Sequence, residues 1–248
     1  MTIPVPNGSQ DAAATIPDNV KTVPLVAAAV CPHPPMLVPE VAAGAAGELD
    51  DLRAACRAAV AHLDPADVLI VVGADATTIR REPPFGGTLA PWGIDRRVGE
   101  PAEDPLPLSL LIGAWLLEDG HNRNVRYHSI AADAAPADCE ALGRSLRHIG
   151  TDAALLVLGD GSACHGEKAP GYDDPRAEGF DAAVADALAK GDTAALRDLD
   201  PALAAELLAV GRAPWQVLAG AVDTPFGTTE LLHHSAPYGV GYFVASWR

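Results

Sequence analysis

Three continuous apolar segments constrain the fold of this chain more than any other feature. They are "VPLVAAAV", which ends at Val30, "DVLIVVGA", which ends at Ala74, and "AALLVLGD", which ends at Asp160. None of them alternates between apolar and polar residues, and such continuous runs are typical of strands covered on both faces of a sheet. Two further strands are predicted at "NVRYHSI" and, near the C-terminus, at "GYFVASW".

Segments with helical spacing of apolar residues lie between these strands. They cover residues 47–64, 107–120, 138–150, 174–192 and 200–222. Strands that alternate with helices predict an α/β fold, here a three-layer domain with a mixed, mostly parallel central sheet flanked by helices. We expect one such domain over residues 23–248. Residues 1–22 are rich in proline and polar residues and are predicted to form a flexible N-terminal tail.

The composition excludes several classes of partner. The 248 residues include 17 Lys and Arg against 33 Asp and Glu, which gives a formal net charge of −16. A chain this acidic repels phosphate backbones and acidic lipid surfaces, so we expect neither nucleic acid nor a membrane as a partner. No segment approaches the roughly 20 apolar residues that span a bilayer. The start of the chain lacks the pattern of a signal peptide, and the four scattered cysteines indicate reduced thiols, so a cytoplasmic location is expected.

Polar residues follow the three buried strands at the point where each strand ends. His33 follows the first strand, Asp75 and Thr77 the second, and Asp160, Ser162 and His165 the third. Since ligands of open α/β sheets bind beyond the carboxyl ends of the strands, these residues predict a common pocket. The alternative is structural: His33 would hydrogen-bond loop backbone, and the two aspartates would cap turns.

Other motif-based sites are not supported. The segment "GDGSAC" is a partial dinucleotide-binding fingerprint, but the residues after it do not predict a helix. The chain contains no phosphate-binding GxxxxGK[ST] motif and no GxSxG elbow. Cys164 and His165 are neighbours in sequence, and neighbours on an extended chain face opposite ways, so this pair is not predicted to be a catalytic dyad.

Several segments, in order along the chain, resemble the class III extradiol ring-cleavage dioxygenases, and most closely the LigB-like catalytic subunits and the Memo-like branch. These are "VCPHPPMLVPEV", "DVLIVVGADA", "GDGSACHGEKAPGYDDPRAEGFDAAV", "AVGRAPWQVLAGAV" and "SAPYGVGY". The resemblance covers roughly residues 23 to 248. It implies a site for Fe(II) or another divalent metal, held by two histidines and one carboxylate, with a further histidine as acid/base. It also implies a small aromatic substrate and a homodimer.

The resemblance further implies that most of these functional positions are substituted. His33 matches the first metal-ligand histidine, whereas Asp75 stands in place of the second. Ala163 stands at the acid/base position, with His165 two residues later. Val210 falls near the last ligand position, and Glu206, one helical turn earlier, is the candidate third ligand.

Two functional hypotheses follow, and a third is structural. In the first, the metal site is rebuilt and supports ring cleavage or another metal-assisted reaction. His33 and Asp75 would then bind the metal, His165 and Asp160 would be catalytic, and substrate would contact Thr77, Ser162, Tyr172 and Arg212. In the second, the chain is a non-catalytic member that binds a small ligand or a protein partner. In the third, it is a structural subunit of an oligomer.

Overall fold

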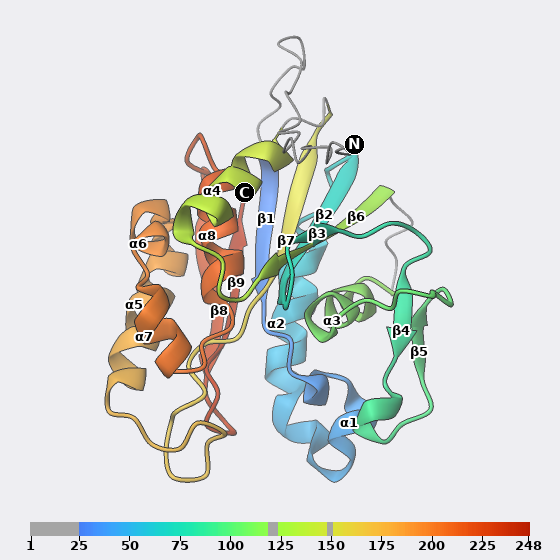
Figure 1. Ribbon diagram of the computed structural model, residues 1–248, viewed down its shortest axis with the longest axis vertical. Coiled ribbons are helices and arrows are strands. Elements are labelled where there is room, and N and C mark those ends of the chain that lie inside the picture. The colour runs from blue at the N-terminus through green and yellow to red at the C-terminus, as the bar shows by residue number, and fades with distance from the viewer. Residues whose placement is uncertain (1–24, 119–123, 148–150) are drawn as a thin grey trace, which may run out of the picture.

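A seven-stranded mixed sheet forms the centre of the molecule (Figure 1). The computed structural model describes residues 25–118, 124–147 and 151–248, so the predicted tail at 1–22 lies outside the described residues. The strand order is β3-β6-β2-β7-β1-β9-β8, and the central strands β6, β2, β7 and β1 are parallel. The strands are β1 (Leu25–Cys31), β2 (Val68–Asp75), β3 (Ile79–Arg80), β6 (Asn124–Ala131), β7 (Ala153–Leu158), β8 (Thr229–Ser235) and β9 (Tyr242–Trp247). Two short strands, β4 (Gly86–Thr88) and β5 (Arg97–Gly99), form a separate hairpin.

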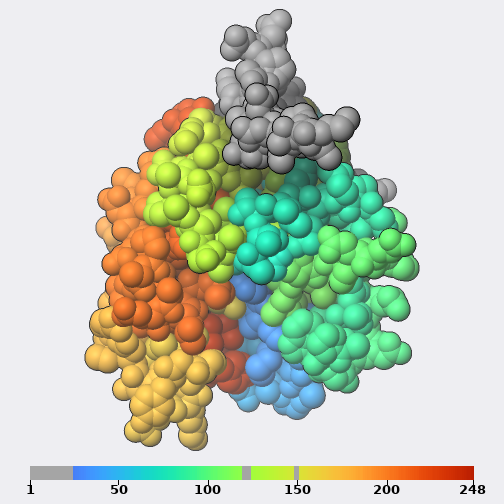
Figure 2. Space-filling view, viewed as in Figure 1, coloured from blue at the N-terminus to red at the C-terminus, as the bar shows by residue number. Residues whose placement is uncertain are grey.

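Helices cover both faces of the sheet, which confirms the predicted three-layer α/β fold. They are α1 (Pro39–Ala42), α2 (Asp50–Ala61), α3 (Leu108–Leu116), α4 (Pro136–Leu146), α5 (Arg176–Lys190), α6 (Thr193–Arg197), α7 (Pro201–Glu206) and α8 (Arg212–Ala221). One hydrophobic core lies between the sheet and α4, α5 and α8, and the other lies between the sheet and α2 and α3. Figure 2 shows the segments of α4 to α7, in lime to orange, on one flank and those of β4, β5 and α3, in green, on the other. None of the helices in the described part of the chain has the length and apolar character needed to cross a membrane.

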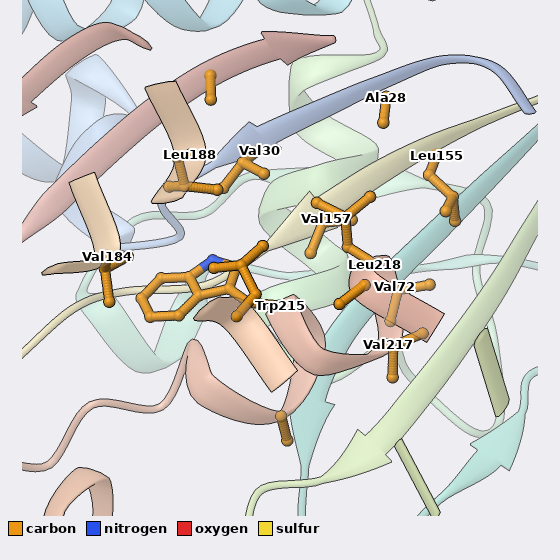
Figure 3. Close-up of a cluster of buried hydrophobic side chains, with 14 of the residues drawn as sticks. Ala28, Val30, Val72, Leu155, Val157, Val184, Leu188, Trp215, Val217 and Leu218 are labelled. Carbon is orange, nitrogen blue, oxygen red and sulfur yellow. The ribbon is translucent and has the colours of Figure 1, made fainter. Parts of the chain in front are cut away.

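Trp215 fixes α8 against the sheet. Its fully buried side chain lies among Val30, Val157 and Leu188 (Figure 3) and makes an edge-on contact with Phe243, with ring centroids 5.7 Å apart. A buried aromatic ring contributes a large apolar area and a specific contact geometry. This packing places the N-terminal end of α8 beside the carboxyl edge of the parallel strands.

Close approach between α4 and α8 depends on two glycines. A Cβ atom at Gly143 would lie 2.2 Å from the carbonyl oxygen of Val217, and one at Gly220 would lie 2.6 Å from the backbone of Glu140. Neither position has room for a side chain unless the two helices move apart.

The segment 200–222 is not one helix, as its pattern predicted, but two. Asp200 caps α7 by accepting from the N–H groups of Ala202 and Leu203, and α8 begins only at Arg212. Between the helices, Leu208 adopts a left-handed backbone with φ of 55°. A continuous helix cannot pass through such a residue, and the resulting turn shapes the cavity described below.

Candidate functional site

His33 and Asp160 form one polar pair at the carboxyl edge of the sheet. His33 lies two residues beyond β1 and is 7% exposed, and Asp160 lies two residues beyond β7. The backbone N–H of His33 donates to Oδ1 of Asp160 at 2.8 Å, and His33 Nδ1 lies 3.6 Å from the same oxygen. Burial raises the pKa of the Asp160 carboxyl, although His33 acts in the opposite direction. The structure thus brings two of the predicted site residues together as a buried acid beside an imidazole.

His165 pairs with a different carboxylate, Asp181 of α5. His165 Nε2 lies 2.6 Å from Oδ2 of Asp181, and the N–H of Ser162 donates to Oδ1 of the same group at 2.9 Å. Asp181 is 1% exposed, and this burial raises its pKa, against the lowering effects of the Ser162 N–H and His165. The pair ties the loop of residues 159–166, which we call the site loop, to α5.

Gly241 makes room for this second pair. A Cβ atom at Gly241 would lie 2.1 Å from Oδ2 of Asp181, and one at Gly161 would lie 2.8 Å from Oδ1. The N–H of Gly161 also donates to the carbonyl oxygen of Gly241 at 2.7 Å. The carboxylate of Asp181 is therefore enclosed by two glycine backbones, which have no side chain that would displace it.

Asp75 belongs to a separate ion-pair network. Its carboxylate pairs with Arg81, whose guanidinium also donates to Asp104 at 3.0 Å. Thr77 lies on the surface, and its backbone carbonyl oxygen accepts from the hydroxyl of Ser129 at 2.9 Å. Asp75 is thus engaged on the β6 side of the sheet, and no ion pair or hydrogen bond joins it to His33 among the described residues.

The other predicted site residues of this region are spread between core and surface. Ser162 is fully buried, and its hydroxyl oxygen accepts from the N–H of Cys164 at 3.2 Å. Tyr172 is 61% exposed and has a left-handed backbone with φ of 62°. Glu206 accepts a hydrogen bond of 2.6 Å from Arg176 on the surface. Glu206 is therefore engaged with Arg176 rather than with His33 or His165.

Arg212 is a buried cation held by neutral groups. It is 2% exposed and donates to the carbonyl oxygens of Ala132 and Ala134, at 2.7 and 2.5 Å, and to Oε1 of Gln216 at 3.0 Å. No carboxylate among the described residues forms an ion pair with it. Burying an arginine without an opposite charge is costly, so an anion beside it would be stabilised.

A cavity of about 390 Å³ lies next to Arg212. Ala132 and Asp133 line it beyond the end of β6, and Arg212 lines it at the start of α8. The rest of its wall comes from α7 and the turn that follows, and is apolar: Pro201, Ala202, Ala204, Ala205, Leu208, Ala209 and Val210. The exposed carboxylate of Asp133 carries the negative charge of the lining. An apolar wall with a few polar groups is typical of a small-molecule site.

Backbone hydrogen bonds attach the cavity wall to the site loop. The N–H of Gly211 donates to the carbonyl oxygen of Asp160 at 2.8 Å, and the N–H of Ala163 donates to that of Leu207 at 2.8 Å. The His33–Asp160 pair and the cavity are thus neighbours at one edge of the sheet, although neither His33 nor Asp160 lines the cavity.

The donor set does not fit the metal that the resemblance implied. Fe(II) in such a site needs two imidazoles and a carboxylate directed at one point. In the described ranges, no group of three His, Cys, Asp or Glu side chains is arranged to hold a metal ion. His33 lies beside Asp160, Asp75 is paired with Arg81, and His165 is bonded to Asp181. We therefore derive no step through a bound metal.

Sequence reasoning assigned no role to Asp181 or to the cavity turn. Asp181 occupies the buried face of α5 with Phe180, Val184 and Leu188. An acid among apolar residues at helical spacing is the signal that identifies it. The cavity depends on the left-handed turn at Leu208, for which leucine gives no sequence signal.

Comparison with known proteins adds the family. The sequence model of one protein family, the catalytic LigB subunit of aromatic ring-opening dioxygenase, matches residues 106–245, more than half of the chain. The chain belongs to the LigB family. In this LigB-family chain, the matched part contains Asp160, His165, Asp181 and Arg212, whereas His33 and Asp75 precede it. The predicted resemblance to extradiol dioxygenases is confirmed at this level.

One solved structure extends the likeness beyond the matched segment. The crystal structure of uncharacterized protein JW3007 from Escherichia coli K12 is 17% identical, with a TM-score of 0.53, and covers 90% of this chain and 99% of that chain. At this identity the similarity shows the fold alone. No curated protein matches the chain.

Proposed function

We propose that this LigB-family protein binds a small aromatic carboxylic acid in the cavity beside Arg212 and does not carry out iron-dependent ring opening. The observation that carries the proposal is the division of the expected metal donors among separate protein partners. An aspartate that is paired with an arginine must give up that partner before it binds a metal, and His165, whose Nε2 is bonded to Asp181, keeps only Nδ1 for one.

The chemistry of the cavity favours this class of ligand. Its apolar wall suits an aromatic ring, and the buried charge of Arg212 favours a negatively charged group on that ring. The carboxylate of Asp133 lines the same cavity and repels an anion, so it sets the direction from which the charged end of the ligand enters. The carboxylate would lie on the Arg212 side and the ring along α7.

The two histidine–carboxylate pairs have a supporting role in this proposal. Asp181 holds the site loop through Ser162 and His165, and Asp160 holds the segment after β1 through His33. Buried carboxyl groups with raised pKa values beside imidazoles are also suited to hold or transfer a proton. The proposal assigns them first to positioning, because neither pair lines the cavity.

The second candidate is ring opening at a rebuilt metal site, which family membership favours. In that case Asp75 would have to leave Arg81 and converge on one ion with His33 and with His165 or Glu206. Tyr172 and Thr77 would then contact substrate from the surface side. This candidate predicts stoichiometric metal binding, which the first candidate does not.

Equilibrium binding of benzoate and of its neutral isostere benzamide tests the proposal. Benzoate is expected to bind saturably and at least about tenfold more tightly than benzamide, because only benzoate forms a charge-assisted contact with Arg212. The variant Ala205→Leu fills the cavity and is expected to abolish binding. Ala183→Leu, at an exposed alanine of α5 outside the cavity, is the matched control and is expected to bind normally.

Two results would contradict the proposal. One is equal binding of benzoate and benzamide, which would remove the role of the buried charge. The other is unchanged benzoate affinity in Ala205→Leu, which would place the ligand elsewhere on the molecule.

A further inference from the structure

Three basic side chains gather at the edge of the sheet that is formed by the short strand β3, which pairs with β6. Strand β8 forms the opposite edge. Arg80 of β3 lies opposite His128 of β6 in the antiparallel register. Arg126 lies two residues before His128, and residues two apart on a strand share a face of the sheet. We call these three residues the basic edge.

The basic edge surrounds a hollow. Arg80, Arg126 and His128 line a cavity of about 180 Å³ together with Ile70 and the last turn of α4, Ser145 and Leu146. Arg80 and Arg126 also line a second cavity of about 290 Å³. Both arginines thus line two spaces, and neither space shares a residue with the cavity beside Arg212.

The positive charge of the basic edge is poorly balanced, although the whole chain carries a net charge of −16. Arg80 has one ion pair, with Glu82 at 3.3 Å, in which both side chains are more than half exposed. Within the described ranges, Arg126 has no ion pair. Exposed pairs such as Arg80–Glu82 contribute little stability and are readily exchanged for a stronger partner.

His128 responds to this excess of charge. Burial, Arg80 and Arg126 together hold the pKa of His128 at about 4, so its imidazole is neutral near pH 7. The groups that face His128 from the packed elements are Arg80 from β3, Arg126 from its own strand, and Ile70, Ser145 and Leu146, which carry no charge. An anion in the hollow would remove the repulsion and favour the protonated imidazole.

We propose that the basic edge is a binding site for a tetrahedral oxyanion, biologically a phosphate group. Two guanidinium groups from different strands and one imidazole bring donors from three side chains to one hollow. Such an arrangement suits the distributed oxygens of phosphate, and arginine forks bind these oxygens in pairs. The site is independent of the function proposed above.

The second cavity, which shares Arg80 and Arg126 with the hollow, is the space proposed for the organic part of a phosphate ester. Phe85, Pro83 and Val125 line it beside the two arginines, and the ring of Phe85 packs on Tyr127 with centroids 4.8 Å apart. Glu82 lies in the same lining and would be displaced from Arg80 by the anion. Free phosphate would occupy only the hollow at His128. Phe85 packs on Tyr127, whose side chain faces the opposite side of β6 from His128, so the organic part of a phosphomonoester would reach Phe85 only past Arg80 and Arg126 at the edge of the sheet.

Calorimetric titration with inorganic phosphate and with phenyl phosphate, at low ionic strength, tests the site. Saturable binding of one phosphate per chain is expected, and Arg126→Gln and Arg80→Gln are each expected to weaken it at least about tenfold. Arg97→Gln, at an exposed arginine of β5 away from the hollow, is the matched control and should leave affinity unchanged. Ala205→Leu should also leave it unchanged. Tighter binding of phenyl phosphate supports a phosphomonoester, and equal binding supports free phosphate.

The pH dependence of sulfate binding gives a second readout that involves His128. Sulfate keeps its double charge between about pH 8 and about pH 5, so a change in affinity over this range reports on the protein. Sulfate affinity is expected to rise as the pH falls, and His128→Gln is expected to remove the rise. The proposal is overturned if phosphate fails to bind at millimolar concentration, or if Arg97→Gln weakens binding as much as Arg126→Gln.

Discussion

The site loop and the basic edge differ in how their charged groups are paired. At the site loop, the buried carboxylates of Asp160 and Asp181 each face a histidine. At the basic edge, Arg80, Arg126 and His128 face one another, and Arg126 has no ion pair within the described residues. At the site loop each imidazole lies beside a carboxylate, although Nδ1 of His33 forms no hydrogen bond in the part of the chain that the structure describes, whereas a region of unbalanced positive charge gains stability from an anion. The comparison teaches that the positions matching the family's metal site need not be the places where this chain binds ions.

The largest effect is expected from breaking the pair at the site loop. Asp181→Ala leaves the Ser162 N–H and the His165 ring without their buried acceptor, and we expect it to lower the free energy of unfolding by about 3 kcal/mol. Urea denaturation measures this change. Asp186→Ala, which removes the exposed partner of Lys190 on the same helix, is expected to change stability by less than about 0.5 kcal/mol. Equal effects of the two substitutions would mean that the buried pair is not structural.

The glycine enclosure of Asp181 gives the next effect. Gly241→Ala places a methyl group 2.1 Å from Oδ2 of Asp181, so backbone or carboxylate must shift, at a cost of about 2 kcal/mol. Gly179→Ala on α5, whose added methyl group meets nothing within 4 Å, is expected to stabilise the protein slightly. Thermal unfolding of both variants makes the comparison, and a stable Gly241→Ala would show that the site loop adapts freely.

At the basic edge, stability should depend on pH through His128. The folded state holds the pKa of His128 at about 4, below the ordinary value of 6.5, so it binds fewer protons than the unfolded state between these values. The stability contributed by neutral His128 is therefore present above about pH 6.5 and is lost as the pH falls toward 4. After allowance for partial exposure, the loss is about 1–2 kcal/mol.

The raised pKa values of Asp160 and Asp181 act in the opposite direction, because the folded state takes up protons on these carboxyl groups as the pH falls. The difference between the native chain and His128→Gln isolates the histidine. We expect the variant to lose less stability on acidification, as measured by urea denaturation at a series of pH values. Parallel curves for the two proteins would contradict the charge repulsion assigned to the basic edge.

The smallest effect is expected at the mouth of the Arg212 cavity. Asp133→Asn removes a negative charge from the lining, and benzoate affinity is expected to rise by about twofold to fivefold. The gain should shrink at high salt because Asp133 is exposed. Unchanged affinity at low salt would show that the bound carboxylate does not approach this side.

Local sequence patterns predicted much of the fold and the position of His33 and Asp160 in the site. The continuous apolar strands placed His33 and Asp160 at the same edge, because adjacent parallel strands end together. The partner of His165 comes from a helix 16 residues later, and strand-end reasoning does not reach it. Asp75 was expected beside His33, but Arg81, only six residues along the chain, takes its carboxylate. Competition between near and distant partners is decided by packing rather than by spacing.

The two proposed ligand sites show the same limit. Arg126 and His128 lie two residues apart on one strand and share a face, and the segment "NVRYHSI" shows this spacing. Arg80 joins them from a two-residue edge strand, which is too short to leave a pattern. The predicted single domain, homodimer, Memo-like relationship and cytoplasmic location stay predictions.

Elemental analysis after anaerobic loading with Fe(II) tests the central claim most directly. The loaded protein is desalted and its iron is measured beside that of His33→Ala, and oxygen uptake with catechol is followed in both. Because the expected donors are held by separate partners, we predict far less than one iron per chain, equal amounts in both proteins and no oxygen uptake. One iron per native chain that is lost in His33→Ala, together with oxygen uptake, would contradict the account and establish a live metal site.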